Sequence, residues 1–231
     1  MIILTFDTDY MTPETMDSFI SNYPQLPRST FFVHPDSLNW SNEFHEINEH
    51  PIIETLEGYS FTTTRNAPFG GLGVRSHSCV SSHLISVEWA KAGLLYQSQE
   101  TRWNQKYSKP ERTAWGIFDL PISYMDNQDI WMERNWQGKH TKFSSDIINR
   151  ALEGDEVYLF DFHPLHIALN TSSVEDYGKK KHKIVGESVN PWELTTTGYG
   201  TKDFFEQLLT GIEESGSSTT TCVEFVTANN V

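Results

Sequence analysis

Short apolar runs alternate along this chain with stretches whose apolar residues recur at helical spacing. The apolar runs are typical of buried strands because β-branched and aromatic side chains dominate them, and each run ends at polar or turn-forming residues. Five such strands are predicted, at residues 2–6, 29–33, 115–120, 157–160 and 222–226.

The stretches with helical spacing predict helices between these strands. Thr12 and Pro13 form a helix start ahead of Met16 and Phe19, and residues 143–152 and 204–212 each carry one apolar face. Strands that alternate with helices predict βαβ units, and therefore a parallel sheet or barrel of the α/β class. Residues 171–200 lack periodicity and are expected to form a long mobile loop near the site. One domain over residues 1–231 is expected.

The negative charge of the chain argues against binding to nucleic acid or to membrane surfaces. Its net charge is -14 with only 17 Lys and Arg, which argues against nucleic acid and membrane surfaces as partners. The one basic run, at residues 179–181, is interpreted as a solvated loop. No signal peptide and no apolar segment long enough to span a bilayer are apparent, so a cytoplasmic location is expected. The two cysteines, Cys79 and Cys222, are expected to be free thiols.

The candidate catalytic and metal-binding residues are polar side chains that follow the predicted strands. Asp7 and Asp9 follow the first strand, and His163 and His166 follow the strand at 157–160, so both pairs lie on one rim if these strands are parallel. Carboxylates and histidines together predict a site for a divalent metal such as zinc, which takes three protein ligands in catalytic sites. Further donors are available at His45, His50 and His77.

Each of these residues also has an ordinary structural interpretation. Asp7 and Asp9 can cap the following helix, and His50 before Pro51 can be a helix cap or a surface histidine. Arg75 and the histidine at position 77 follow a glycine-rich segment that also suits a plain turn.

The order of these segments resembles the polysaccharide deacetylase family with the NodB-homology domain, also called carbohydrate esterase family 4, and is most similar to its WbmS-like branch. The resemblance spans most of the chain and implies a distorted (β/α) barrel with parallel strands. It is carried by residues 5–9, 30–33, 45–51, 75–77 and 162–170.

The resemblance implies a metal site and a general base at the first motif. Asp7 is expected to be the base, and Asp9, His50 and His77 to hold the metal. The two aspartates are adjacent in the family but are separated by one residue here, so a turn must split their roles. The family's usual second metal histidine falls on Glu54, which is the alternative to His77 as third ligand. Zinc is the expected ion, with cobalt or another transition ion as alternatives.

The resemblance also implies roles for residues of the later motifs. His163 is expected to be the catalytic acid, Asp126 to orient it, and Arg75 to keep Asp7 ionised, since a nearby cation favours the charged carboxylate. His166 is expected to be structural.

The implied activity is hydrolysis of an N-acetyl or related acyl group on a sugar unit in surface-polysaccharide biosynthesis, and the expected partner is an acetylated saccharide. The first alternative is a non-catalytic carbohydrate-binding relic, for which the seven Trp and nine Tyr provide stacking surfaces. The second is a haloacid-dehalogenase-like phosphatase, which leaves His50, His77 and His163 without a role. The sugar, the acyl group and the oligomeric state are left open.

Overall fold

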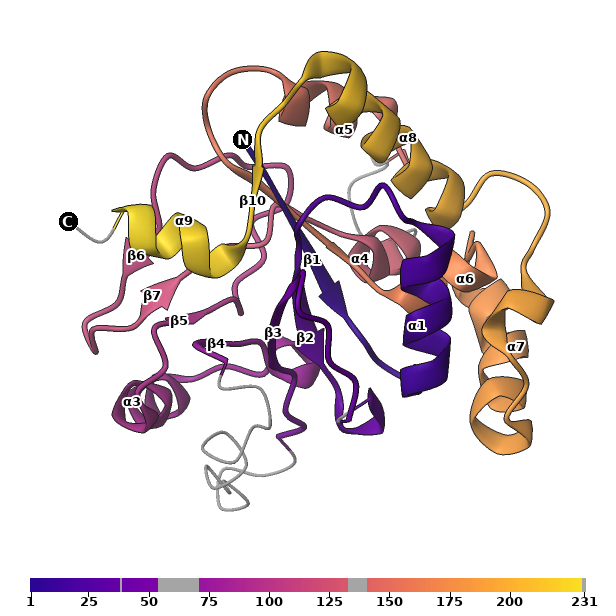
Figure 1. Ribbon diagram of the computed structural model, residues 1–231, viewed down its shortest axis with the longest axis horizontal. Helices are drawn as coiled ribbons and strands as arrows, with labels where there is room; N and C mark the ends of the chain where they lie inside the picture. Colours follow the sequence, from indigo (N-terminus) through magenta and orange to yellow (C-terminus); the bar gives the residue numbers. More distant parts are fainter. Residues whose placement is uncertain (38, 54–70, 133–140, 230–231) are drawn as a thin grey trace.

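The computed structural model describes residues 1–37, 39–53, 71–132 and 141–229, and a curled sheet forms its centre (Figure 1). Neighbouring strands are parallel, except for the antiparallel pair β6 and β7. Across the sheet the strands are β6 (Glu111–Arg112), β7 (Phe118–Asp119), β5 (Tyr96–Gln97), β4 (Gly73–Val74), β3 (Glu46–Glu49), β2 (Thr30–Val33), β1 (Ile2–Asp7), β9 (Tyr158–Phe162) and β8 (Tyr124–Met125), with β10 (Thr219–Thr220) beside the start of β1.

The curl turns the sheet into a half-barrel, in agreement with the distorted barrel that the sequence predicts. Isolated bridges join Thr101 to Ile122 and Tyr107 to Val157. They connect the chain that follows β5 with the chain that leads into β8 and β9, although these strands are far apart in the order of the sheet. The carboxyl ends of the central strands therefore converge on one rim.

The two faces of the sheet bury separate apolar clusters. Ile2, Leu4 and Phe6 of β1 point to one cluster and Ile3 to the other, as the period of two in a strand requires. The first cluster packs against the helices α1 (Pro13–Asn22), α5 (Ser145–Leu152) and α8 (Thr201–Ser215). The second cluster collects residues from β2, β5, β7, β8 and β9, which places it on the concave face.

The helix expected after the first strand is present. Thr12 is its N-cap, with a reciprocal capping box to Thr15, and Pro13 occupies its first turn. Both cysteines are free thiols, as expected. Among the described residues, no helix has the length and apolar composition needed to cross a membrane.

The strand predicted at 222–226 is wrong, because these residues begin the helix α9 (Cys222–Asn229). Thr221 and Glu224 form a capping pair: the backbone N–H of Thr221 donates to the Glu224 carboxylate at 3.0 Å, and the backbone N–H of Glu224 donates to the Thr221 hydroxyl at 3.3 Å. Cys222, Phe225 and Val226 are buried against the concave cluster. In Figure 1, α9 and α1 lie on opposite sides of β1.

Two other segments differ from expectation. Where a long loop is expected, the structure has the helix α7 (Val174–Glu187), which is capped by Ser173 and carries ion pairs from Lys179 to Glu175 and from Lys180 to Asp176. The basic run is therefore helical. The strand predicted at 115–120 shortens to β7, because Gly116 has φ +87° in a turn that precedes it.

Candidate active site

A turn after β1 separates the two aspartates of the first motif. β1 ends at Asp7, and the backbone N–H of Met11 donates to the Thr8 carbonyl at 3.1 Å, while Tyr10 has φ 59°. The Asp7 carboxylate consequently contacts Arg75, whereas the Asp9 carboxylate faces histidines from other loops. The turn therefore separates the surroundings of Asp7 from those of Asp9, as the sequence analysis expects.

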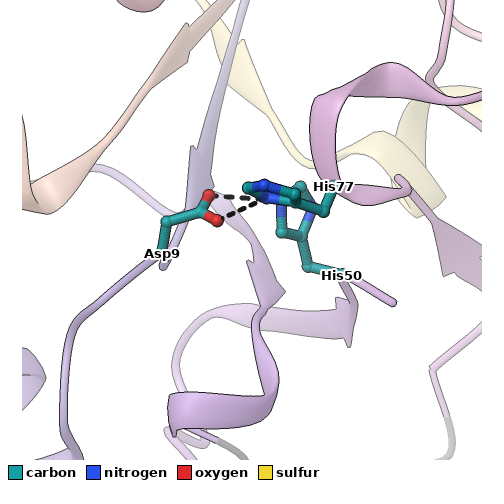
Figure 2. A group of neighbouring side chains, drawn as sticks. All are labelled: Asp9, His50 and His77. Carbon is teal, nitrogen blue, oxygen red and sulfur yellow. Dashed lines mark ion pairs between the residues drawn. The ribbon is translucent and has the colours of Figure 1, made fainter. Parts of the chain in front are cut away.

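Asp9, His50 and His77 converge from three different segments (Figure 2). His50 directly follows β3, and His77 begins the short 3₁₀ helix η2 (His77–Cys79). Oδ1 of Asp9 lies 2.6 Å from Nδ1 of His77, and Oδ2 lies 3.2 Å from Nε2 of His50. Asp9 and His50 are buried, and the His77 side chain is about one-third exposed.

The donor atoms of this cluster have the character of metal ligands. Both carboxylate oxygens of Asp9, Nε2 of His50 and Nδ1 of His77 are buried, and within the described part of the chain they make no hydrogen bond to any group outside the cluster, so that their short contacts are with one another. Nδ1 of His50 lies 2.8 Å from the carbonyl oxygen of Arg75 and donates to it, which leaves a lone pair on Nε2 for the centre of the cluster. One carboxylate and two imidazoles fit zinc or a related divalent ion.

The side chains of the cluster also shift one another's pKa values. Burial alone would raise the pKa of Asp9, but the charge of His50 and the contacts with the His50 and His77 rings hold it well below its usual range. Burial lowers the pKa of His50, and the carboxylates of Asp7 and Asp9 raise it more strongly.

A second combination of donors overlaps the first. Asp7, Asp9 and His163 also lie within ligand distance of one another. In that set, however, Asp7 accepts a hydrogen bond from Arg75 at 3.0 Å, and Nε2 of His163 has another contact, with the side-chain nitrogen of Asn127 at 3.4 Å. The set with Asp9, His50 and His77 is therefore the better metal site, because its donors have no other partners.

Arg75 is fully buried and joins Asp7 to a carboxylate that the sequence analysis left without a role, Asp161. The guanidinium also donates to the carbonyl and the hydroxyl of Ser98, at 3.0 and 2.8 Å. Burial raises the pKa of Asp161, and the adjacent Arg75 guanidinium opposes this by favouring the carboxylate. The available signal was the spacing of two along β9, which puts Asp161 on the same face as His163.

Asp126, the first residue of α4 (Asp126–Trp131), holds His163 at two points. One carboxylate oxygen lies 2.7 Å from the imidazole Nδ1, and the other accepts the backbone N–H of His163 at 2.8 Å. Burial lowers the pKa of His163, but the charge of Asp126 and its hydrogen bond raise it to about 10. Nε2 of His163 faces the metal cluster, 3.6 Å from Asp9.

His166 lies near His163 because α6 (Pro164–Leu169) starts directly after it, and the ring centroids are 5.3 Å apart. Both of its ring nitrogens have partners: Nδ1 lies 3.0 Å from the Thr171 hydroxyl, and Nε2 lies 3.3 Å from Oδ1 of Asn127. Burial lowers the pKa of His166 to about 4. A neutral, fully partnered imidazole agrees with the expected structural role.

A cavity of about 390 Å³ is lined by Asp7, Asp9, His50, His77, His163 and His166. Its outer wall includes Tyr10, Trp131, Tyr177 and Lys181. Lys181 donates to the Tyr10 hydroxyl at 2.8 Å and lies 4.2 Å from the centre of the Tyr10 ring. The cavity thus has polar chemistry at its base and aromatic side chains at its wall, as sites for small organic molecules generally do.

Among the other candidate donors in the described residues, His45 is not part of this cluster, and a further histidine is close to it. His45 accepts the backbone N–H of Ser29 at 3.2 Å and does not line the cavity. Glu54, the alternative third ligand, lies outside the described residues. His34, which follows β2 and was not assigned, has Nε2 3.7 Å from the Asp9 carboxylate.

The half-barrel, with its carboxylates and histidines at one rim, is the architecture of polysaccharide deacetylases with the NodB-type fold. More particularly, this chain belongs to the WbmS-like polysaccharide deacetylase family, whose model matches residues 4–181. The family match removes the haloacid-dehalogenase-like alternative. A comparison with curated proteins found no significant match.

One solved structure with a TM-score of 0.70 supports the same fold. A protein from Bordetella bronchiseptica, described as a polysaccharide deacetylase involved in O-antigen biosynthesis, is 19% identical with a TM-score of 0.70, over 90% of this chain and 89% of that one. A polysaccharide deacetylase structure from Mycobacterium smegmatis is 14% identical with a TM-score of 0.45, over 94% of this chain and 91% of that one.

Proposed function

We propose that this protein is a divalent-metal-dependent hydrolase that removes an N-acetyl or related acyl group from a sugar unit. One observation carries the proposal: four buried donor atoms of Asp9, His50 and His77 face one another and, within the described residues, have no hydrogen-bond partner outside their cluster. Buried polar atoms that have only one another as partners are a place where an ion can satisfy several lone pairs at once. Membership in a polysaccharide deacetylase family supports the saccharide substrate.

The proposed substrate is a surface polysaccharide or one of its precursors. The support is the description of the Bordetella protein as involved in O-antigen biosynthesis. The polar base and aromatic wall of the cavity suit a sugar ring, which has both hydroxyl groups and apolar faces.

Asp9, His50 and His77 would hold the ion. When bound there, zinc or a related ion would supply a Lewis acid that lowers the pKa of water and polarises a carbonyl group. Asp7 is the proposed general base that takes the proton of the attacking water. Arg75 keeps the Asp7 carboxylate in place through the contact of 3.0 Å.

His163 is the proposed general acid. Its raised pKa, about 10, favours the protonated imidazole at neutral pH, and Nε2 is the nitrogen directed to the cluster. In that form it can donate a proton to the departing amine nitrogen, while Asp126 retains the proton on Nδ1.

Elemental analysis of the purified protein tests the proposal without any assumption about the substrate. About one transition ion per chain is expected, with zinc first and cobalt as an alternative, and His50→Ala should lose it. His182→Ala is the matched control, because His182 is exposed on α7. If the protein binds no metal after zinc or cobalt has been supplied, the proposed metal-dependent mechanism is wrong, and the non-catalytic carbohydrate-binding alternative is favoured.

A further inference from the structure

A second hollow, of about 820 Å³, is lined in part by the chain that follows His77. His77 and Cys79 line the first cavity, and Ser81 and Ser82, a few residues later, line the second. The walls of the second hollow are the start of α3 (His83–Ala92), the chain at the end of β5, and the β6–β7 hairpin. Nothing in the proposed hydrolysis uses these residues.

The hairpin presents a tryptophan at the edge of this hollow. Trp115 is 47% exposed and lies at the hairpin tip, before Gly116. The tip is closed by the backbone N–H of Thr113, which donates to the Ile117 carbonyl at 2.9 Å, and by the backbone N–H of Gly116, which donates to the Thr113 carbonyl at 3.0 Å. An exposed indole held by a closed turn is a preorganised surface for stacking.

Two polar atoms in the wall of the hollow have no partner within the described part of the chain. They are Nε2 of Gln99 and Oδ1 of Asp119, on side chains that are only 5% and 8% exposed. The oxygen of the Gln99 amide is used, since it accepts from the Ser76 hydroxyl at 2.9 Å. The amide nitrogen thus offers a donor and Asp119 an acceptor, and each is costly to leave unpaired.

The rest of the lining narrows the chemistry of the ligand. Among the described residues, no Lys or Arg lines the hollow, which disfavours a phosphate or another anion. Burial, together with the charge of Glu100, raises the pKa of Asp119 to about 6. A carboxyl that titrates near neutral pH can accept from a hydroxyl group or donate to one.

We propose that this hollow is a subsite for a second sugar unit, which stacks on Trp115 and hydrogen-bonds to Gln99 and Asp119. A hydrogen bond connects the wall of this hollow to the first cavity. Gln99 accepts from the hydroxyl of Ser76, and Ser76 is the residue between Arg75 and His77. The inference rests on the proposed function for the identity of its ligand, and it makes the substrate at least a disaccharide.

Binding measurements test this subsite separately from catalysis. The probes are the mono-, di- and trisaccharides of β-1,4-linked N-acetylglucosamine and of β-1,4-linked glucose, titrated calorimetrically into the inactive variants His50→Ala and Asp7→Asn. In at least one series, the disaccharide should bind about tenfold more tightly than the monosaccharide, a difference of about 1.4 kcal/mol. Trp115→Ala should abolish this gain, and Asp119→Asn should reduce it.

Leu84→Ala is the matched control, because Leu84 is 66% exposed on α3 and does not line the hollow. The control should keep the gain with chain length. The proposed subsite would be refuted if the Trp115→Ala variant showed the same gain in affinity from monosaccharide to disaccharide, or if neither saccharide series showed such a gain. A protein without metal or turnover that keeps Trp115-dependent binding would instead overturn the proposed function alone.

Discussion

Nδ1 of His163 lies 2.7 Å from Oδ1 of Asp126, and the other oxygen of this carboxylate accepts the backbone N–H of His163. The two contacts fix both the ring and its backbone, so Nε2 remains directed to the Asp9 carboxylate, 3.6 Å away. A general acid needs this arrangement, because proton transfer depends on the position and protonation of a single nitrogen.

Replacement of Asp126 by Asn should therefore impair turnover while the metal is retained. The amide can keep part of the geometry but loses the charge that stabilises the imidazolium, and we expect a loss of about 10²-fold or more. Steady-state rates and metal content measure the two effects. Proton NMR supplies an independent check, because the downfield resonance of the hydrogen-bonded Nδ1–H should disappear. Unchanged turnover would contradict the role of Asp126.

Asp7→Asn should separate metal binding from catalysis. The amide cannot take a proton from water, so turnover should fall by about 10²- to 10⁴-fold, the usual contribution of general base catalysis. Metal content should stay near that of the wild type, because the proposed ligands are Asp9, His50 and His77. His50→Ala, by contrast, should lose both. A metal-free Asp7→Asn protein would show that these roles are assigned incorrectly. Full turnover in the Asp7→Asn variant would exclude Asp7 as the general base. If the wild-type protein binds saccharide but shows no turnover, it is the non-catalytic carbohydrate-binding protein of the first alternative.

Arg75→Met should destabilise the fold strongly. The guanidinium is fully buried between Asp7 and Asp161, so its removal leaves two buried carboxylates without their cation, at a cost of about 3–5 kcal/mol. The double variant Arg75→Met/Asp161→Leu should recover part of the loss, because one of the two carboxylates is then absent. Urea denaturation of the single and double variants measures the coupling. Strict additivity would mean that Arg75 and Asp161 do not interact.

His45 should make the fold sensitive to mild acid. Burial, together with the charge of Arg28, lowers the pKa of His45 to about 4, below the ordinary value of 6.5. Between these values the unfolded chain binds a proton that the folded chain does not. The free energy of unfolding therefore falls as the pH drops from 6.5 toward 4, by up to about 1.4 kcal/mol per pH unit from this residue.

The test is urea denaturation at pH 7, 5.5 and 4.5 for the wild type and for His45→Gln. The amide keeps an acceptor for the backbone N–H of Ser29 but does not titrate. The variant should lose less stability on acidification than the wild type does. Parallel pH profiles for the two proteins would refute the prediction.

Local sequence patterns predicted much of the architecture. The strands at 2–6, 29–33 and 157–160 and the helices at 143–152 and 204–212 are present because their apolar periodicity coincides with burial on the sheet. The helix at Cys222 was missed, since a short run with Val and Phe resembles a strand when periodicity alone is considered. Its capping pair, Thr221 and Glu224, was the available signal.

The candidate site was predicted in part. Asp9, His50 and His77 are the ligands that the sequence analysis predicts, and the structure brings them together; it also places Asp126 beside His163, while the roles of these residues remain predictions. Asp161 was not assigned because no local pattern pairs it with Arg75. That contact joins residues 86 positions apart, and it depends on the curl of the sheet, which brings the end of β4 to β9 across three intervening strands.

The sequence by itself determined the α/β class, the order of the strands along the chain and the residue types available at their ends. These properties follow from hydrophobic periodicity and from short-range capping, which act over a few residues. Only the tertiary structure decided which donors share a centre, which nitrogen of His50 faces it, and how one buried guanidinium serves both Asp7 and Asp161. The physical reason is that these contacts depend on the curl and register of the sheet, which arise from the packing of the whole chain.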